Sequence, residues 1–252
     1  MVQNESDIFS ASRLWDVPVA FVLLTRLPLP ALPDTAFANS ARAVWAYPLV
    51  GLGLGAIVSI LAWLAAFALP PLFVAGLVLA TLVMLTGAMH EDGLADTVDG
   101  IWGGQTAARR LEIMKDSRIG AYGVLALVLA IGFRWLGLAE VAWNGLITAL
   151  VVSRAMMVPL MLVLPHARSD GLSKSVGRPD GFAVGGALVT SALCAVLLAG
   201  GAGMFAMLIA AAVAAAIGAL AKAKIGGQTG DILGATQITT EIAVLLVLVA
   251  LA

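Results

Sequence analysis

The sequence predicts an all-α integral membrane bundle of about seven transmembrane helices, built as a single domain over residues 1–252. Two observations carry this prediction. The 252 residues are 61% hydrophobic and only 12% charged, with a mean hydropathy of +1.03, whereas soluble domains carry about 25% charged residues. The apolar residues also fall in runs of about 20, the length that a helix needs to cross the hydrocarbon core of a bilayer.

The chain begins with a polar segment, residues 1–43, that we expect on the cytoplasmic side or in the membrane interface. This segment lacks the basic start, apolar run and small-residue cleavage site of a secretory signal. Within it, residues 15–32 are apolar but are interrupted by Arg26, Pro28 and Pro30. We therefore expect residues 15–32 to lie near the interface and not to cross the membrane.

Seven apolar runs follow within residues 44–252, and each is expected to form one transmembrane helix. The runs cover residues 44–68, 72–89, 119–138, 141–164, 183–200, 203–221 and 235–252. Short connections between them alternate with three long ones, at 90–118, 165–182 and 222–234. This alternation places all three long connections on one side of the membrane.

The charged residues follow the same alternation. Twelve of the 14 Lys and Arg residues lie in the N-terminal segment or in the three long connections. Because cytoplasmic loops are enriched in Lys and Arg, the N-terminus and these loops are expected in the cytoplasm, with the C-terminus outside. The net charge of −1 argues against a basic surface for nucleic acid. We expect the function to reside on the cytoplasmic side.

The first long connection opens with the acidic run His90-Glu91-Asp92-Gly93-Leu94-Ala95-Asp96-Thr97-Val98-Asp99-Gly100. If the preceding helix continues, Asp92, Asp96 and Asp99 lie on one stripe of its surface. These like charges repel, so a cation should offset them. Mg²⁺ and Mn²⁺ suit such oxygen ligands, since they bind through a few carboxylates plus substrate phosphates. The alternative is a solvated acidic helix end, and His90 is left open between interfacial packing and substrate contact.

Further along, the same connection becomes basic, from Arg109 to Arg118. Its pattern predicts a short amphipathic helix on the membrane surface, with cations able to reach a phosphate. Lys115, Asp116 and Arg118 are the better candidates for substrate binding because they stand at the entry to the next span. Ordinary positive-inside charges explain Arg109 and Arg110 equally well.

The third long connection ends in Gly226-Gly227-Gln228-Thr229-Gly230-Asp231, directly before the last span. Glycines let backbone N–H groups approach a phosphate at a helix N-terminus, where the helix dipole also favours anions. Gly227, Thr229 and Gly230 are therefore candidates for substrate binding. The alternative is a plain turn with Thr229 or Asp231 as the N-cap. We expect this turn to fold back onto the acidic stripe.

Charged residues also lie inside the predicted spans. Arg154 and Glu241 should face the interior of the bundle, because an unpaired charge in lipid is costly. We count both among the substrate-binding candidates, and for Arg154 a structural ion pair remains an equal alternative to phosphate contact. Arg134 lies closer to the end of its span and is expected to snorkel to the interface.

Together these motifs resemble the cobalamin synthase family, also called adenosylcobinamide-GDP ribazoletransferase or CobS. The likeness covers nearly the whole chain and rests on four elements in order: Tyr47-Pro48-Leu49-Val50-Gly51, the run from His90 to Gly100, the run from Arg110 to Gly120, and the run from Gly226 to Ala235. Glu91 falls where the family pattern is variable, so we leave it out of the metal set.

The resemblance implies a Mg²⁺-dependent transferase at the cytoplasmic face of the bacterial inner membrane, acting in the last assembly step of cobalamin (vitamin B12). A hydroxyl of α-ribazole, or of its 5′-phosphate, would attack adenosylcobinamide-GDP and release GMP. In this reading Asp92 and Asp96 bind the metal, Asp99 is the base or a second-metal ligand, and Asp231 completes the site. Phosphates would be bound by Lys115, Arg118 and Arg154. A homo-oligomer or a complex with other cobalamin-assembly enzymes stays open.

Two alternatives remain. A CDP-alcohol phosphotransferase also uses spaced aspartates at the cytoplasmic end of a membrane helix, but the longer pattern of that family is absent here. A secondary transporter could use Arg154 and Glu241 as coupling groups. It would predict inverted repeats, which the sequence does not show, and it leaves the aspartate stripe unexplained.

Overall fold

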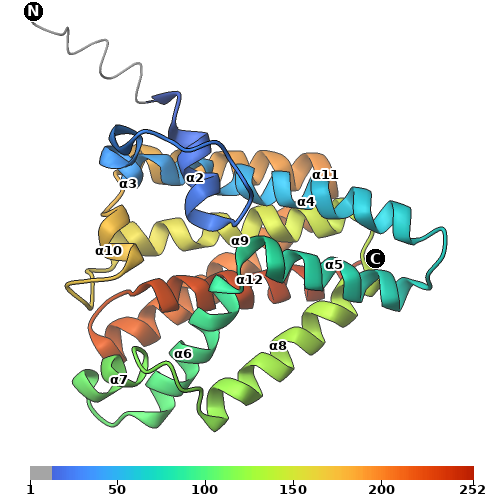
Figure 1. Ribbon diagram of the computed structural model, residues 1–252. Coiled ribbons are helices and arrows are strands. Elements are labelled where there is room, and N and C mark those ends of the chain that lie inside the picture. The colour runs from blue at the N-terminus through green and yellow to red at the C-terminus, as the bar shows by residue number, and fades with distance from the viewer. Residues whose placement is uncertain (1–12) are drawn as a thin grey trace, which may run out of the picture.

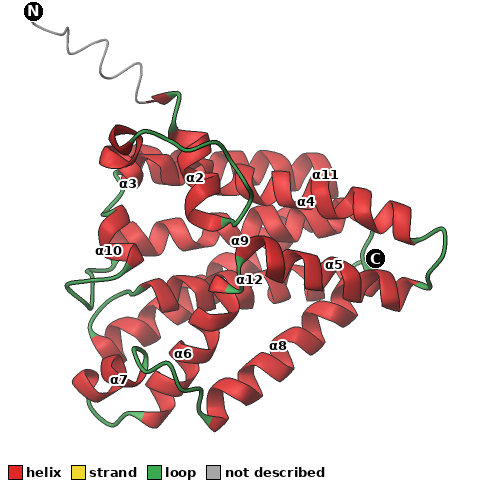
Figure 2. Cartoon of the chain, viewed as in Figure 1, coloured by secondary structure: helices red, strands yellow, loops and turns green. Residues whose placement is uncertain are grey.

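The computed structural model describes residues 13–252, and this part of the chain is a bundle of helices without β-strands (Figures 1 and 2). Five helical segments are long and apolar enough to cross a membrane. The first segment, Asp34–Ala65, ends in α4 (Tyr47–Ala65). The other four are single helices: α8 (Ala121–Glu140), α9 (Trp143–Val163), α11 (Gly181–Ile225) and α12 (Gly230–Ala250). The predicted multi-pass helical membrane protein is confirmed.

The long α11 is two helices that meet at Gly200. This residue has φ 57° and ψ −137°, a conformation open to glycine but not to other residues. A Cβ atom at Gly203 would lie against the carbonyl oxygen of Ala195, whereas eight residues of straight helix span about 12 Å. The chain therefore turns back sharply at Gly200, and its two halves correspond to the predicted spans 183–200 and 203–221.

The second span, predicted over residues 72–89, is not one straight helix in the structure. Helix α5 (Pro71–Thr86) ends three residues before the predicted limit, and α6 (Met89–Gly103) leaves it at an angle of 85°. Gly87 and Ala88 make this corner with positive φ angles of 65° and 57°. The helix thus does not continue into the acidic run. Instead the acidic residues form a separate helix, and α5 with α6 counts as one further, broken span.

Helix α9 lies at the centre of the bundle and packs against α4, α11 and α12. Small residues allow the closest approach: a Cβ at Gly51 of α4 would lie 2.3 Å from the backbone oxygen of Leu150 on α9. Such small-residue contacts are typical of helix packing in membranes, where lipid offers no hydrophobic drive for association. Helix α12 in turn contacts α6 and α8, which brings the C-terminal span against the acidic helix.

The described part of the N-terminal segment, residues 13–43, covers one corner of the bundle, and the polar residues before it lie outside the described part of the chain. Helix α2 (Asp16–Leu24) has nine residues and is too short to cross a bilayer, as predicted. The short elements η1 (Asp34–Asn39), α3 (Ser40–Ala43) and η2 (Val44–Ala46) follow it. Asp16 holds them together, since its carboxylate accepts hydrogen bonds from Arg42 at 2.8 Å and from the Trp45 ring at 3.0 Å.

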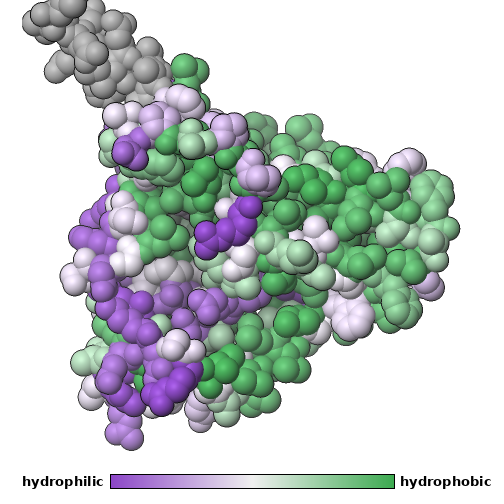
Figure 3. Space-filling model, viewed as in Figure 1, coloured by the Kyte–Doolittle hydropathy of each residue, from purple (hydrophilic) through white to green (hydrophobic). Residues whose placement is uncertain are grey.

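Polar residues gather at one end of the molecule. In Figure 3 the hydrophilic surface lies over the region of α6, α7 (Ala107–Ile113) and α10 (Leu172–Val176), whereas the flank of the bundle is hydrophobic. The three long connections meet at this end, as the alternation of short and long connections predicts. The candidate site is therefore sought here.

Candidate active site

The acidic helix and the glycine turn lie side by side, which confirms the predicted fold-back. A Cβ at Gly93 of α6 would lie 3.0 Å from the backbone oxygen of Asp231, and one at Gly234 of α12 would lie 3.3 Å from the Cα atom of His90. Glycine at both positions lets the two backbones touch. Asp92, which precedes Gly93, is thereby held next to the start of α12.

This contact gathers three carboxylates, those of Asp92, Asp96 and Asp231, into what we call the carboxylate cluster. Asp92 is exposed, and the other two are partly exposed. The negative charges of Asp92 and Asp231 both act on Asp96. The carboxylates of Asp92 and Asp96 form no hydrogen bond or ion pair within residues 13–252. Such a cluster repels itself and favours a bound cation.

One cation already lies in the cluster, and sequence reasoning missed it. The Nη2 atom of Arg168 lies 2.9 Å from Asp231 Oδ2, and the Arg168 side chain is only 14% exposed. Its Nε atom is buried without a hydrogen-bond partner in the described residues. From sequence, Arg168 was one of several positive-inside charges in the loop 165–182. Only the folding of this loop against the glycine turn distinguishes it.

That folding depends on Gln228 in the glycine turn. The Gln228 backbone N–H donates to Pro165 O at 2.8 Å, and Ala167 N–H donates back to Gln228 O at 2.9 Å. Gly227 is confined by the same contact, because a Cβ there would lie 2.1 Å from Pro165 O. The short bridge carries Arg168 into the carboxylate cluster.

Other residues of the glycine turn start α12. The Thr229 hydroxyl accepts a hydrogen bond from Ile232 N–H at 3.3 Å and so caps the helix. This is the N-cap role weighed for Thr229 from sequence. Gly230, in contrast, borders open space, with no atom within 4 Å of a Cβ placed there. Of the turn residues proposed for substrate binding, Gly230 is the one that the structure leaves accessible.

Asp99 is placed differently from the expectation. Its two carboxylate oxygens accept hydrogen bonds from the backbone N–H groups of Gly120, at 2.7 Å, and Gly123, at 2.8 Å. The carboxylate fills the space that a Cβ at either glycine would need. Asp99 is buried and holds the first turn of α8, so we leave it out of the proposed base and metal ligands.

No ready-made metal site is present within residues 13–252, since no three His, Cys, Asp or Glu side chains there converge as a ligand group. The predicted set of four aspartates is therefore not assembled. The donor chemistry nevertheless fits Mg²⁺, which commonly takes one or two carboxylates and completes its shell with substrate phosphates and water. Asp92 and Asp96, free of other partners, are the side chains that offer such a pair.

The predicted phosphate-binding cations of the first connection are paired elsewhere. Lys115 lies 2.6 Å from Asp170, which ties the first long connection to the second. Arg118 lies 2.6 Å from Asp116, and the hydrogen bonds from Arg118 lower the pKa of Asp116 to about 2. These pairs are largely exposed, so each contributes little to stability. None of them contacts the carboxylate cluster.

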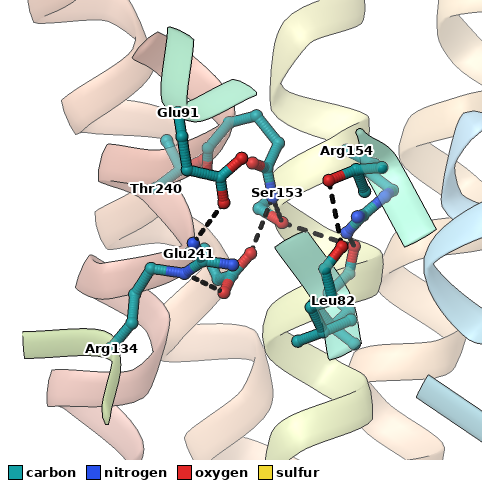
Figure 4. Close-up of polar contacts among 10 residues, drawn as sticks. Leu82, Glu91, Arg134, Ser153, Arg154, Thr240 and Glu241 are labelled. Carbon is teal, nitrogen blue, oxygen red and sulfur yellow. Dashed lines mark hydrogen bonds and ion pairs between the residues drawn. The ribbon is translucent and has the colours of Figure 1, made fainter. Parts of the chain in front are cut away.

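The charges inside the membrane region form a buried network (Figure 4). Arg134 donates to Glu91 at 2.6 Å and to Glu241 at 2.8 Å, and its side chain is 4% exposed. The expectation that Arg134 snorkels is wrong, because two carboxylates pair with it inside the bundle. Glu91 thus serves in helix packing, and it joins α6 to α8 and α12.

Arg154 and Glu241 are both buried in this region. Arg154 Nη1 donates to Leu150 O at 3.0 Å, while Glu241 accepts from Gln237 at 2.7 Å as well as from Arg134. Both residues are at most 2% exposed. The structure gives them no contact with the carboxylate cluster, and their place in substrate binding stays a prediction.

Comparison with known proteins decides between the classes left open by the sequence. The sequence pattern of the family described as cobalamin-5-phosphate synthase (CobS) matches residues 16–249. The chain belongs to this family. The resemblance seen in the sequence is thereby confirmed, and neither the CDP-alcohol phosphotransferases nor the transporters are needed to explain the chain.

Relatives of this CobS chain carry one name. This chain is 43% identical over 239 residues to adenosylcobinamide-GDP ribazoletransferase of Bradyrhizobium diazoefficiens, with 92% of each chain covered. It is 45% identical over 241 residues to the protein of that name from Mesorhizobium japonicum, again with 92% of each chain covered. No solved structure matches the chain. The fold and the carboxylate cluster described above are thus those of a CobS protein.

Proposed function

We propose that this CobS protein is an adenosylcobinamide-GDP ribazoletransferase. Its relatives bear that name over nearly their full length. In the reaction a ribose hydroxyl of α-ribazole, or of its 5′-phosphate, attacks the phosphorus nearest the corrinoid. A new P–O bond forms, the bond from that phosphorus to the bridging oxygen breaks, and GMP leaves with this oxygen. Cobalamin or its 5′-phosphate is the product.

The observation that carries the chemistry is the meeting of Asp92 and Asp96 with the Asp231–Arg168 pair. A protein catalyses phosphoryl transfer mainly by positioning the reactants and by offsetting negative charge. The guanidinium of Arg168 has a buried, unpartnered Nε–H and would donate to a phosphate oxygen of the GDP-bearing substrate. The accessible N-terminus of α12 at Gly230 adds backbone donors.

Asp92 and Asp96 are the residues proposed to hold Mg²⁺. When bound, the ion would neutralise charge on the phosphate oxygens and help to orient them. The carboxylates themselves have a second task, because the attacking hydroxyl must lose its proton. A carboxylate of the cluster that is not engaged by the ion would accept this proton.

We further propose that the site faces the cytoplasm at the bacterial inner membrane. The support is the gathering of twelve of the 14 Lys and Arg residues in the N-terminal segment and the three long connections. The carboxylate cluster lies at the same polar end of the bundle. Both substrates are water-soluble and anionic or sugar-bearing, which suits an open polar face.

The test is an assay of the full-length protein in detergent with adenosylcobinamide-GDP and α-ribazole. GMP release is followed by chromatography, with Mg²⁺ or with a chelator, and α-ribazole 5′-phosphate is tried in parallel. GMP should appear only when Mg²⁺, the GDP-bearing substrate and one of the acceptors are all present. No release with either acceptor, from protein that stays monodisperse, would contradict the proposed function.

A further inference from the structure

A small, partly open pocket lies directly behind the glycine turn. Its volume is about 50 Å³, enough for a few water molecules. Gly230 and Gly234 of α12 border it on one side and His90 of α6 on another. Asp231 stands between the two glycines, and Asp92 lies two residues after His90. The pocket is therefore next to the carboxylate cluster.

The lining of this cavity is apolar except for a few polar groups. Met89, Met157 and Met161 contribute flexible thioether side chains, and leucines complete the wall. No Lys, Arg, Asp or Glu side chain lines the cavity. Methionine adapts to irregular shapes and makes favourable contacts with aromatic rings. The chemistry of this lining thus suits an uncharged aromatic group and not a phosphate, and a double ring would need the pocket to open further.

Two polar groups in the lining lack partners. His90 is 2% exposed, and its Nε2 atom forms no hydrogen bond within residues 13–252. Tyr47 is 4% exposed, and its hydroxyl has no hydrogen bond to any described residue. Buried polar groups are nearly always satisfied, because leaving one unpaired costs about 1–3 kcal/mol. The buried, unpaired Nε2 atom of His90 therefore points to a ligand with a hydrogen-bonding atom, and the Tyr47 hydroxyl in the same lining offers a second contact.

One side of the pocket is formed by the short helix α10. Helix α10 supplies Leu172, Ser173 and Val176 to the lining. It is bounded by Gly171 and Gly177, whose φ angles are 95° and 89°. Glycine moves between such conformations at little cost. Outward movement of α10 would enlarge the cavity, and the hydrogen bond from Ser173 Oγ to Gln228 Oε1 would re-form when it closes.

We propose that this cavity is the binding site for the aromatic base of the ribazole acceptor, with Tyr47 and His90 as its hydrogen-bonding partners. The proposal rests on the ribazoletransferase function. A benzimidazole-type base is an apolar double ring with one free nitrogen, which matches a methionine-rich wall with a hydroxyl donor. The guanine of GDP carries more polar atoms than this lining could satisfy. Binding here would direct the attached ribose toward the carboxylate cluster.

The test compares Tyr47→Phe with Tyr122→Phe, which alters the only other tyrosine of the chain, an exposed one. Tyr47→Phe removes a single oxygen, and the Michaelis constant for α-ribazole should rise about tenfold, as expected for one lost hydrogen bond. The Michaelis constant for adenosylcobinamide-GDP should stay within about twofold, and Tyr122→Phe should match the wild type in both. An unchanged acceptor constant, or a rise confined to the GDP-bearing substrate, would overturn the proposal.

A second pair of variants fills space. Met161→Phe enlarges a cavity residue, whereas Met84→Phe enlarges a side chain that is 76% exposed. Met161→Phe should weaken the binding of α-ribazole. Free benzimidazole should inhibit the wild type competitively against α-ribazole, and it should inhibit Met161→Phe less. Inhibition that is equal in both proteins would place the base elsewhere. If the wild type itself released no GMP, the function would fail and this proposal with it, so the two failures are distinguishable.

Discussion

The guanidinium of Arg168 lies 2.9 Å from the carboxylate of Asp231, and this pair joins the second long connection to the start of the last span. It sets one cation among the three carboxylates of the cluster. The carboxylates of Asp92 and Asp96 remain without a partner of their own in the described residues. The proposed catalysis depends on this imbalance of charge, because the cluster can then take up a further cation.

Arg168 should therefore be needed for the GDP-bearing substrate. Arg168→Met removes the guanidinium, and the Michaelis constant for adenosylcobinamide-GDP should rise about tenfold or more, as for a lost charge-assisted hydrogen bond. Arg178→Met is the matched control, because Arg178 is an exposed residue of the same loop. The Michaelis constant for adenosylcobinamide-GDP is measured for both variants in detergent, under saturating α-ribazole. Equal values in both variants would remove Arg168 from the site.

Two glycines of the turn should respond differently to valine. Gly227 is enclosed by Pro165, so Gly227→Val should lower the yield and the melting temperature of the protein. Gly230 borders open space, so Gly230→Val should fold normally but raise the Michaelis constant for the GDP-bearing substrate several-fold. The melting temperature and both constants are measured side by side. A folded Gly230→Val protein with an unchanged constant would contradict the role of this helix start in phosphate binding.

Asp99 should matter for stability, not for the metal. Asn keeps one acceptor but turns an amide toward the second backbone N–H, so Asp99→Asn should lower the free energy of unfolding by about 1–3 kcal/mol. The Mg²⁺ concentration that gives half-maximal GMP release should stay as in the wild type. A higher Mg²⁺ requirement at an unchanged melting temperature would restore Asp99 to the metal site.

The buried ion network should be far more sensitive than a surface pair. Arg134→Met leaves Glu91 and Glu241 buried without a cation, which costs about 3–5 kcal/mol where measured in other proteins. Arg109→Met breaks the exposed pair with Glu112 and should cost less than about 1 kcal/mol. Thermal unfolding in detergent compares the two. Similar melting temperatures would show that Arg134 contributes no more than a surface residue.

Much of this fold follows from hydropathy alone. Apart from the second, the predicted spans match helices because about 20 apolar residues suffice to identify a crossing. The corner between α5 and α6 was missed, since Gly87, a residue that often ends a helix, lies within an apolar run that reads as one continuous span. The direction in which α6 leaves is fixed by contacts distant in sequence, among them the hydrogen bond from Arg26 N–H to Leu85 O at 2.6 Å.

The site was predicted in part. Spacing alone placed Asp92 and Asp96 on one face, and the glycines of the turn predicted a close approach of backbone. Sequence could not separate Arg168 from the other loop cations, nor Asp99 from its neighbours on the stripe. Both distinctions arise from loop packing that brings distant residues together. The position of Arg134 within its span could be predicted from the sequence, but its two partners, Glu91 and Glu241, could not.

The central claim is tested most directly by GMP release from Asp92→Asn and Asp96→Asn, measured across a Mg²⁺ titration. Asp170→Asn is the control, because Asp170 is an exposed aspartate whose contact is Lys115. Each cluster variant should remain inserted and monodisperse, while its turnover falls by about 100-fold or more or requires much more Mg²⁺. Asp170→Asn should resemble the wild type. Near-normal turnover of both cluster variants at the wild-type Mg²⁺ concentration would contradict the assignment of this cluster as the transfer site.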